Sequence, residues 1–164
     1  MSDQNSNGYE GLKKMLRNPV YAGKTILKDM LPVKQSTVIL DFAKPLLEKI
    51  NMSDKPILEK TINTAVEVWN YCIVIDRACN SSPVENKRLQ KMAFAAAIRA
   101  KLTSRISEKN YYMLLKRKEE IYPNNHYFII EHNVRWSNDN SEFSLSVITN
   151  DASNIDIISE NSSA

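Results

Sequence analysis

The sequence predicts an α+β protein in which a bundle-like core of four to five helices is followed by a C-terminal antiparallel β-hairpin. Apolar residues recur at helical spacing up to about residue 122, and after residue 127 they recur at every second position. A chain of 164 residues with 43% apolar and 25% charged residues is long enough for a globular core. We therefore expect one domain over residues 9–149, between a disordered tail at 1–8 and an acidic polar tail at 150–164.

The first helical segment extends from Tyr9 to Pro32, where apolar residues are interspersed with lysines and an arginine. Asn18 can cap a helix whose first residue is Pro19. Gly23 weakens that helix by about 1 kcal/mol relative to alanine, and Pro32 ends it. The pattern predicts one or two short helices.

A second helix is predicted from Thr37 to Ile50, because six apolar residues share one helical face. These residues are Ile39, Phe42, Ala43, Leu46, Leu47 and Ile50. Pro45 must kink this helix or restart it. A restart would use Lys44 as the cap and Pro45 as the first helical residue, where its missing N–H costs nothing.

The longest predicted helix runs from residue 54 to about residue 79, with Ser53 as its cap and the acidic Asp54 at its start. Its apolar residues fill one half of the helical wheel, which predicts that this is the central helix. They are Ile57, Leu58, Ile62, Ala65, Val66, Val68, Trp69, Cys72, Ile73, Ile75 and Cys79.

The segment Ser82–Glu85, of sequence SPVE, combines a capping box with proline at the first helical position. It predicts the start of a helix that runs to about Leu102. Phe94 and Ile98 form a small apolar stripe on this helix, and its alanines permit close approach to a neighbour. The larger apolar side consists of Leu89, Met92, Ala93, Ala96, Ala97 and Ala100.

The last predicted elements are a helix and a hairpin. Ser104 or Ser107 can cap the helix, which ends near Tyr122. The β-hairpin covers residues 127–149, with a turn at 137–141. Its apolar face should pack on the helices, because an isolated hairpin is only marginally stable. That face consists of Phe128, Ile130, Val134, Trp136, Phe143, Leu145 and Val147.

One sequence pattern resembles a known group of proteins. The motif LDFAxPLL at residues 40–47, followed by the pair Trp69-Asn70, is similar to that of small bacterial proteins without an assigned function. The resemblance spans about residues 38–147 and consists of packing residues plus the Trp-Asn pair. It is silent on activity and adds no catalytic residue.

Cysteines and histidines are too few and too far apart for cross-links or metal sites. Cys72 and Cys79 are separated by about 10 Å of helical rise, which exceeds the reach of a disulfide. His126 and His132 lie about 20 Å apart along a strand, so we expect no structural zinc. Glycine-rich phosphate loops and nucleophile elbows are missing from the sequence, so we expect no cofactor and assign no catalytic residue.

The most directional feature is a basic segment over residues 86–118, which contains ten lysines and arginines and one acid, Glu108. Cations of this kind bind phosphates by releasing counterions, but they also form ordinary solvated helix surfaces. Not all of them can face one way. The candidate contacts with nucleic acid or another partner are Lys87, Arg88, Lys91, Lys101 and Arg105.

Two charged residues fall on apolar helix faces. Asp76 lies on the apolar arc of the central helix, and Lys118 lies on that of the last helix. We expect a buried pair between Asp76 and Lys118, or a different buried acceptor for Lys118, with snorkelling to water as the alternative. His132 lies among the apolar positions of its strand, where it is either a titrating group near a pocket or a satisfied core histidine.

These observations favour a non-catalytic cytoplasmic protein-interaction module, an adaptor or regulator, with an exposed apolar patch between Tyr9 and Leu31. The alternative is an accessory RNA- or DNA-binding protein that uses residues 87–118. An enzyme, with a pocket gathering His132, Asp76 and Lys118, is the third interpretation. We expect no signal peptide or transmembrane segment, and Gly23 and two prolines argue against peripheral membrane contact. It leaves open the oligomeric state and whether the acidic C-terminal segment folds back on the basic one.

Overall fold

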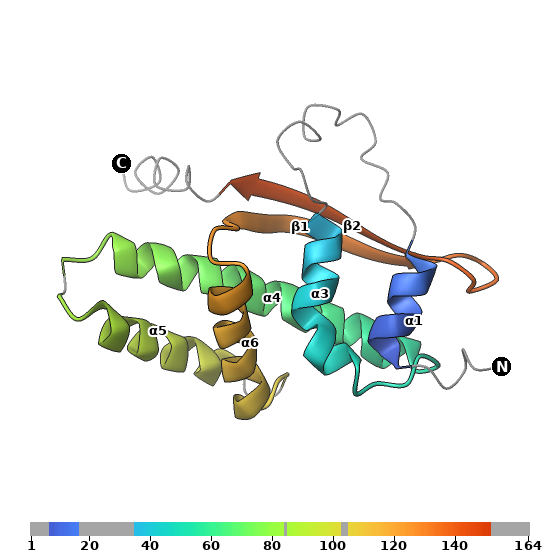
Figure 1. Ribbon diagram of the computed structural model, residues 1–164, viewed down its shortest axis with the longest axis horizontal. Coiled ribbons are helices and arrows are strands. Elements are labelled where there is room, and N and C mark those ends of the chain that lie inside the picture. The colour runs from blue at the N-terminus through green and yellow to red at the C-terminus, as the bar shows by residue number, and fades with distance from the viewer. Residues whose placement is uncertain (1–6, 17–34, 84, 103–104, 152–164) are drawn as a thin grey trace. The chain divides into compact units, whose positions relative to one another are not determined.

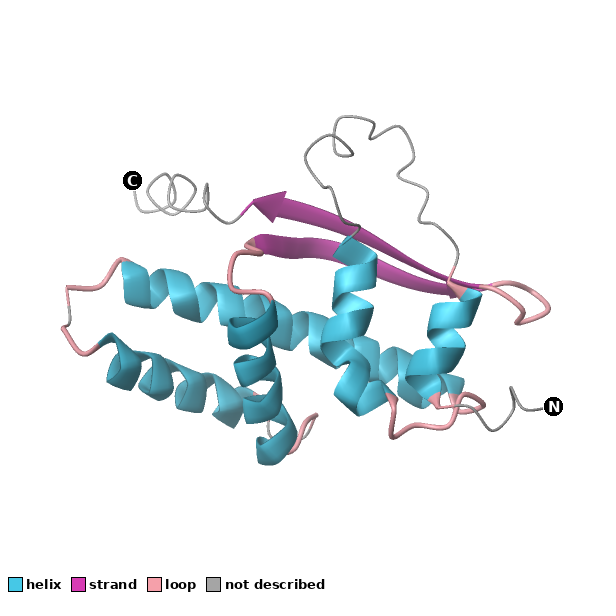
Figure 2. Ribbon diagram, viewed as in Figure 1, coloured by secondary structure: helices cyan, strands magenta, loops and turns pink. Residues whose placement is uncertain are grey.

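The computed structural model describes residues 7–16, 35–83, 85–102 and 105–151 (Figure 1). Over these residues, five helices precede a two-stranded hairpin, which confirms the α+β class (Figure 2). The helices are α1 (Gly8–Met15), α3 (Gln35–Leu47), α4 (Lys55–Asn80), α5 (Lys87–Lys101) and α6 (Glu108–Ile121). The strands are β1 (Tyr127–Trp136) and β2 (Phe143–Asp151).

The chain divides into two compact units. Among the described residues, the first contains residues 7–16, 35–65 and 129–149, and the second contains residues 66–83, 85–102, 105–128 and 150–151. Helix α4 therefore supplies its beginning to the first unit and its remainder to the second. None of the helices within the described residues is long and apolar enough to cross a membrane.

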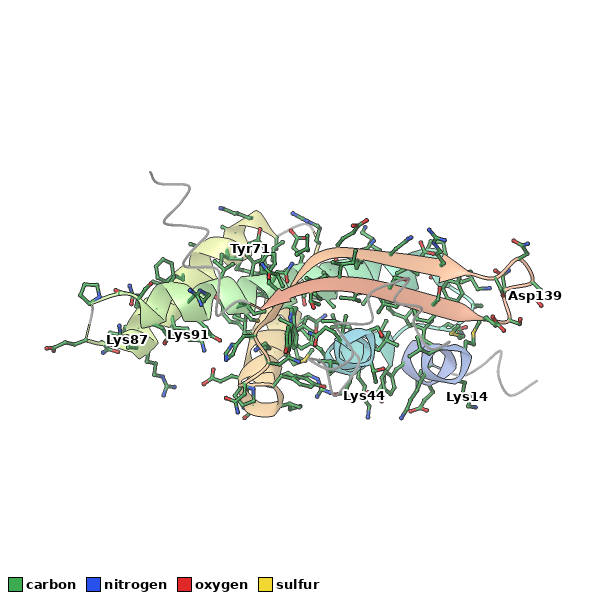
Figure 3. The ribbon with its side chains drawn as sticks, turned by 90° about the horizontal axis from the view of Figure 1, so that it is seen from above. Lys14, Lys44, Tyr71, Lys87, Lys91 and Asp139 are labelled. Atoms are coloured by element: carbon green, nitrogen blue, oxygen red, sulfur yellow. The ribbon has the colours of Figure 1, made fainter. Side chains whose placement is uncertain are left out.

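In the first unit, α1 and α3 lie side by side and run across the strand direction of the hairpin (Figures 1 and 3). The hairpin also contacts the beginning of α4, because the Trp136 indole donates a hydrogen bond to Glu59. The hairpin thus packs on helices, as the sequence predicts. The fully buried core side chains are Leu12, Ile39, Phe42, Leu47, Leu58, Ile62, Phe143 and Leu145.

The N-terminal helix starts earlier than predicted. Asn7 caps α1 by accepting a hydrogen bond from the backbone of Glu10 at 2.9 Å, and Gly8 N donates to Ile50 O at 2.7 Å. Asn7 and Gly8 therefore belong to the fold rather than to the predicted tail at 1–8. At the other end β2 reaches Asp151, past the predicted boundary at 150. Asn18, Gly23 and Pro32 lie outside the described residues.

Helix α3 contains Pro45 in its last turn. Helix α3 is continuous through Lys44, so no restart occurs there, although Pro45 has no N–H for the intrahelical hydrogen bond at its position. Helix α4 matches the predicted span, but Ser53 does not cap it. The Ser53 hydroxyl instead donates to the Asn51 side chain at 2.8 Å, and Asp54 O accepts the first backbone bond, from Leu58 N at 3.0 Å.

The buried face of α4 is the predicted one with a single exception. Ile57 is exposed, whereas the other predicted apolar residues from Leu58 to Cys79 are buried. Ile57 lies in the first turn, where a helix end has fewer neighbours. Trp69 is fully buried, and its indole Nε1 donates to Tyr127 O at 2.9 Å. This indole therefore holds the residue from which β1 starts.

The hairpin starts at the predicted residue and extends two residues past the predicted end at 149, and β2 buries Phe143, Leu145 and Val147 as predicted. In β1 the alternation changes phase, because Ile129 is buried and Ile130 is 61% exposed. Ile130 therefore does not belong to the inward face. At the connecting turn, labelled by Asp139 in Figure 3, the Ser141 and Ser137 hydroxyls donate to Asp139 and lower its pKa to about 2.

In the second unit, α5 and α6 pack on the remainder of α4. Helix α5 is antiparallel to α4, because its first turn contacts Cys79 and its middle, Ala95, lies across a small cavity from Cys72. Ser107 caps α6 by accepting from Asn110 N at 3.2 Å, which confirms one of the two predicted caps. Figure 1 shows α5 running beside α4.

Candidate interaction surface on helix α5

Helix α5 begins four residues after the predicted position. Its cap is Asn86, whose side chain accepts a hydrogen bond from Leu89 N at 3.1 Å. The predicted cap, Ser82, accepts instead from the Gln90 side chain at 2.8 Å. Asparagine and serine are equally good caps, so the capping-box pattern alone could not choose between these two positions.

Helix α5 contacts the rest of its unit through a narrow face. Ala95 is its only buried residue, and the Ala95 carbonyl accepts a hydrogen bond from the Tyr111 hydroxyl at 2.7 Å. Lys91, Ile98 and Arg99 are half-buried beside it. The inward face thus contains one alanine and the aliphatic parts of longer side chains.

The larger apolar side of α5 points to solvent. Leu89 is 61% exposed and Met92 is 59% exposed. At 100° per residue, these two side chains and four exposed alanines fill a contiguous arc of about 140°. The alanines are Ala93, Ala96, Ala97 and Ala100. We call these six residues the α5 apolar face.

Positive charge borders the α5 apolar face on both sides. Arg88 and Arg99 lie along one edge of the arc, and Lys101 lies beyond the other edge. Helix α5 contains five cations and no acid. No carboxylate pairs with Arg88, Arg99 or Lys101 among the residues that the structure describes.

Arg99 carries a further unmet requirement. Its Nε and Nη1 atoms are shielded from solvent and have no hydrogen-bond acceptor among the described residues. A guanidinium has five N–H donors, and donors removed from water without an acceptor destabilise the protein. Two of its donors are therefore enclosed by the second unit rather than open to the apolar face.

Three of the five cations predicted as contacts are used within the second unit. Lys87 Nζ donates to the carbonyl oxygen of Cys79 at 2.8 Å and also to that of Ser82, so it binds the C-terminal end of α4. Arg105 forms an ion pair with Glu67. Lys87 and the third residue, Lys91, lie on the first turns of α5 (Figure 3).

Lys91 forms an ion pair with Asp76 at 2.9 Å and lies 3.5 Å from Glu119. Burial lowers the pKa of Lys91, but the hydrogen bond and charge of Asp76, helped by Glu119, outweigh burial and raise it above the usual value. Lys91 therefore joins α5 to α4 and α6. Arg88 and Lys101 are the two predicted contacts that remain directed to solvent.

Lys118 is buried, as its position on the apolar arc suggests, at 2% exposure. Its Nζ donates to the Tyr122 carbonyl at 2.8 Å and lies 4.9 Å from the centre of the Trp69 ring. Burial lowers the pKa of Lys118. Of the two acceptors considered, Lys118 thus uses the one other than Asp76, whose ion pair is with Lys91.

Asp76 and Lys118 nevertheless line one cavity of about 30 Å³ between α4, α5 and α6. That volume matches one water molecule, so the cavity is too small for a substrate. Cys72 also lines it, and burial raises the pKa of this thiol to about 12, which keeps it protonated and unreactive.

The remaining predicted site residues lie elsewhere. His132 belongs to the first unit, where its Nε2 is 2.8 Å from Asn63 Oδ1 and burial lowers its pKa. Within the described residues, no three His, Cys, Asp or Glu side chains gather as a metal ion would require. The prediction of an exposed apolar patch between Tyr9 and Leu31 is wrong for Tyr9 and Leu12, which are buried. Leu31 lies outside the described residues.

Comparison of the chain with protein-family models, with curated proteins and with solved structures found no match. The functional proposal therefore depends on the geometry of the chain itself.

Proposed function

We propose that this protein is an interaction module that docks another protein on the α5 apolar face. The observation that supports the proposal is the exposure of Leu89 and Met92 within one contiguous apolar arc. Single exposed apolar side chains are common on protein surfaces, but contiguous patches are typical of interaction sites. A partner that covers this face would remove it from water, which is favourable at about 25 cal/mol per Å² of apolar surface.

Binding of nucleic acid is the alternative, and it is less well supported. Lys87, Lys91 and Arg105 already contact carbonyls or carboxylates of the chain. A phosphate would have to displace these contacts before it released counterions. Arg88 and Lys101 remain, but the apolar arc lies between them, and phosphates gain nothing from apolar surface.

The test uses a photoreactive benzoylphenylalanine in place of Met92, and the same residue in place of Ile130 as a control. Ile130 is 61% exposed, against 59% for Met92, and it lies on β1. After irradiation of cells that express the full chain, we expect a discrete covalent adduct with a different protein from position 92 and none from position 130. The captured protein is then purified and its Kd for the unmodified chain is measured.

The substitutions that complete this test are M92E and the matched I130E. We expect Met92→Glu to weaken binding of the purified partner by tenfold or more, and Ile130→Glu to leave it unchanged. Equal weakening by both substitutions, or no adduct at position 92, would contradict the proposal. Binding of labelled oligonucleotides that persists at physiological salt and is lost on reversal of Arg88 and Lys101 would favour the alternative.

A further inference from the structure

We infer that the partner of the α5 apolar face presents an amphipathic helix whose apolar stripe is bordered by acidic residues. This inference rests on the proposed function, and it adds the partner's secondary structure and charge. It depends on two features of α5, which are the size of the side chains in the arc and the charges at its edges.

The side chains of the arc favour a helix over a lipid surface. Alanines at four of the six positions let a second helix axis approach to the short end of the usual range of about 8–10 Å. Leu89 and Met92 form a ridge that fits the groove of such a helix. Membrane-surface helices instead use bulky residues that reach into the lipid, and an alanine-rich face inserts little apolar volume.

The charges at the edges select an acidic partner. A helix seated on the arc would lie between Arg88 and Arg99 on one side and Lys101 on the other. Carboxylates along both edges of that helix would pair with these cations.

The same charges disfavour a second copy of this chain. Two antiparallel α5 helices packed face to face would place Arg88 of each copy near the cations at the C-terminal end of the other. Neither helix supplies an acid. Like charges brought together in this way are repulsive, whereas an acidic helix gains from every border cation.

The test measures fluorescence anisotropy of three labelled, helix-stapled peptides titrated with the full chain. The first has a leucine and alanine stripe bordered by glutamates, the second has the same stripe bordered by lysines, and the third has the glutamates with the stripe shuffled. We expect binding of the first alone, with an affinity that falls as salt rises, since rim charges are screened.

Two double substitutions distinguish an effect of the charges that border the arc from an effect of the net charge of the protein. Arg88→Glu with Lys101→Glu reverses cations that border the arc, and Lys109→Glu with Lys116→Glu reverses exposed cations on α6. Both change the net charge equally. We expect the first pair to weaken binding of the glutamate-bordered peptide roughly tenfold. The second pair should change the affinity for this peptide less than about twofold. Circular dichroism spectra confirm that both variants are folded.

The outcomes distinguish this inference from the proposed function. If Met92 cross-links a partner but the glutamate-bordered peptide does not bind, the acidic-helix inference is wrong and the interaction module stands. If the lysine-bordered peptide binds as well, the charge argument is wrong. Adducts within the same chain at residues 152–164, adducts between copies, or binding to phosphatidylserine vesicles equal to that of the peptide would also overturn it.

Discussion

Lys118 is a cation enclosed within the second unit, with 2% of its surface exposed. Its Nζ donates to the Tyr122 carbonyl at 2.8 Å where α6 ends, and it lies 4.9 Å from the centre of the Trp69 ring. These two interactions oppose the cost of burying the charge, so the net contribution of Lys118 to stability is small or unfavourable.

We expect Lys118→Met to leave the free energy of unfolding unchanged or to raise it, within about 1 kcal/mol, because a flexible apolar chain replaces a buried cation. Urea unfolding at neutral pH measures this change. A loss of more than about 2 kcal/mol would mean that the bonds to Tyr122 and Trp69 outweigh the cost of burying the charge.

The same variant tests the pH dependence of stability. Because the pKa of Lys118 is lower in the fold than the usual 10.5, the unfolded chain binds more protons between the two values. The penalty of the buried charge is therefore present at neutral pH and is relieved as pH rises toward 10.5. The stability of Lys118→Met, measured against pH, should lack this rise, so the difference between the wild-type and variant curves should show it. Lys91, whose pKa is raised, changes stability only above 10.5.

His132 gives a second pH prediction, in the acidic range. Burial lowers its pKa below 6.5, so acidification protonates the unfolded chain first and the free energy of unfolding falls as pH drops through 6.5. We expect His132→Gln, which keeps a polar group near Asn63, to flatten this fall. The ring's titration, followed by NMR, should have its midpoint below 6.5; a midpoint above it would contradict the prediction.

Gly8 is constrained by its surroundings. A methyl group at Gly8 would lie 2.8 Å from the Leu47 carbonyl oxygen, which belongs to the backbone and cannot move aside cheaply. We expect Gly8→Ala to lower the free energy of unfolding by about 1–3 kcal/mol, despite the higher helix propensity of alanine. Glu10→Ala, at an exposed position of the same helix, should change it by less than about 0.5 kcal/mol.

At the scale of elements, the spacing of apolar residues was enough to predict most spans and buried faces. Helix α4 and β2 combine a long stripe with one polar side, so their spans and buried faces follow from sequence. Helix α5 has apolar residues on two sides and two possible caps. Its start and orientation depend on Lys87 and Lys91, which bind α4. Of the smaller stripe, Ile98 is half-buried and Phe94 is 37% exposed.

The start of α5 can be tested by its caps. We expect Asn86→Ala to destabilise the protein by about 1 kcal/mol, because the N–H of Leu89 loses its acceptor, and Ser107→Ala to do the same for α6. Ser82→Ala should destabilise the protein clearly less than these two substitutions, since it removes only a hydrogen bond to the Gln90 side chain. Thermal melts of the three variants rank these effects, and a larger loss from Ser82→Ala would place the helix start at residue 82.

At the scale of the whole molecule, the apolar face and its border charges act against each other. Between copies, burial of Leu89 and Met92 favours association, and the cations of α5 oppose it. We expect the purified protein to remain monomeric at physiological salt and to associate only at high salt, where the Debye length falls to about 3 Å at 1 M. Sedimentation velocity measures this trend, and Leu89→Glu should abolish it.

The division into units could not be predicted from composition, because the chain passes between them inside regular elements. It leaves the first unit within α4 after residue 65, returns within β1 at residue 129 and leaves again within β2 after residue 149. Linkers rich in glycine or proline, which usually mark such passages, are missing at all three points.

The passage within α4 has a consequence for how the molecule melts. A helix propagates its hydrogen bonds from turn to turn, and starting a new end within it is costly. Loss of structure on one side of residue 65 would leave a frayed helix end on the other side, with four unsatisfied carbonyls or amides. Both units should therefore unfold together on heating, in one calorimetric peak. In native-state hydrogen exchange, the amides that exchange most slowly should lie around the middle of α4.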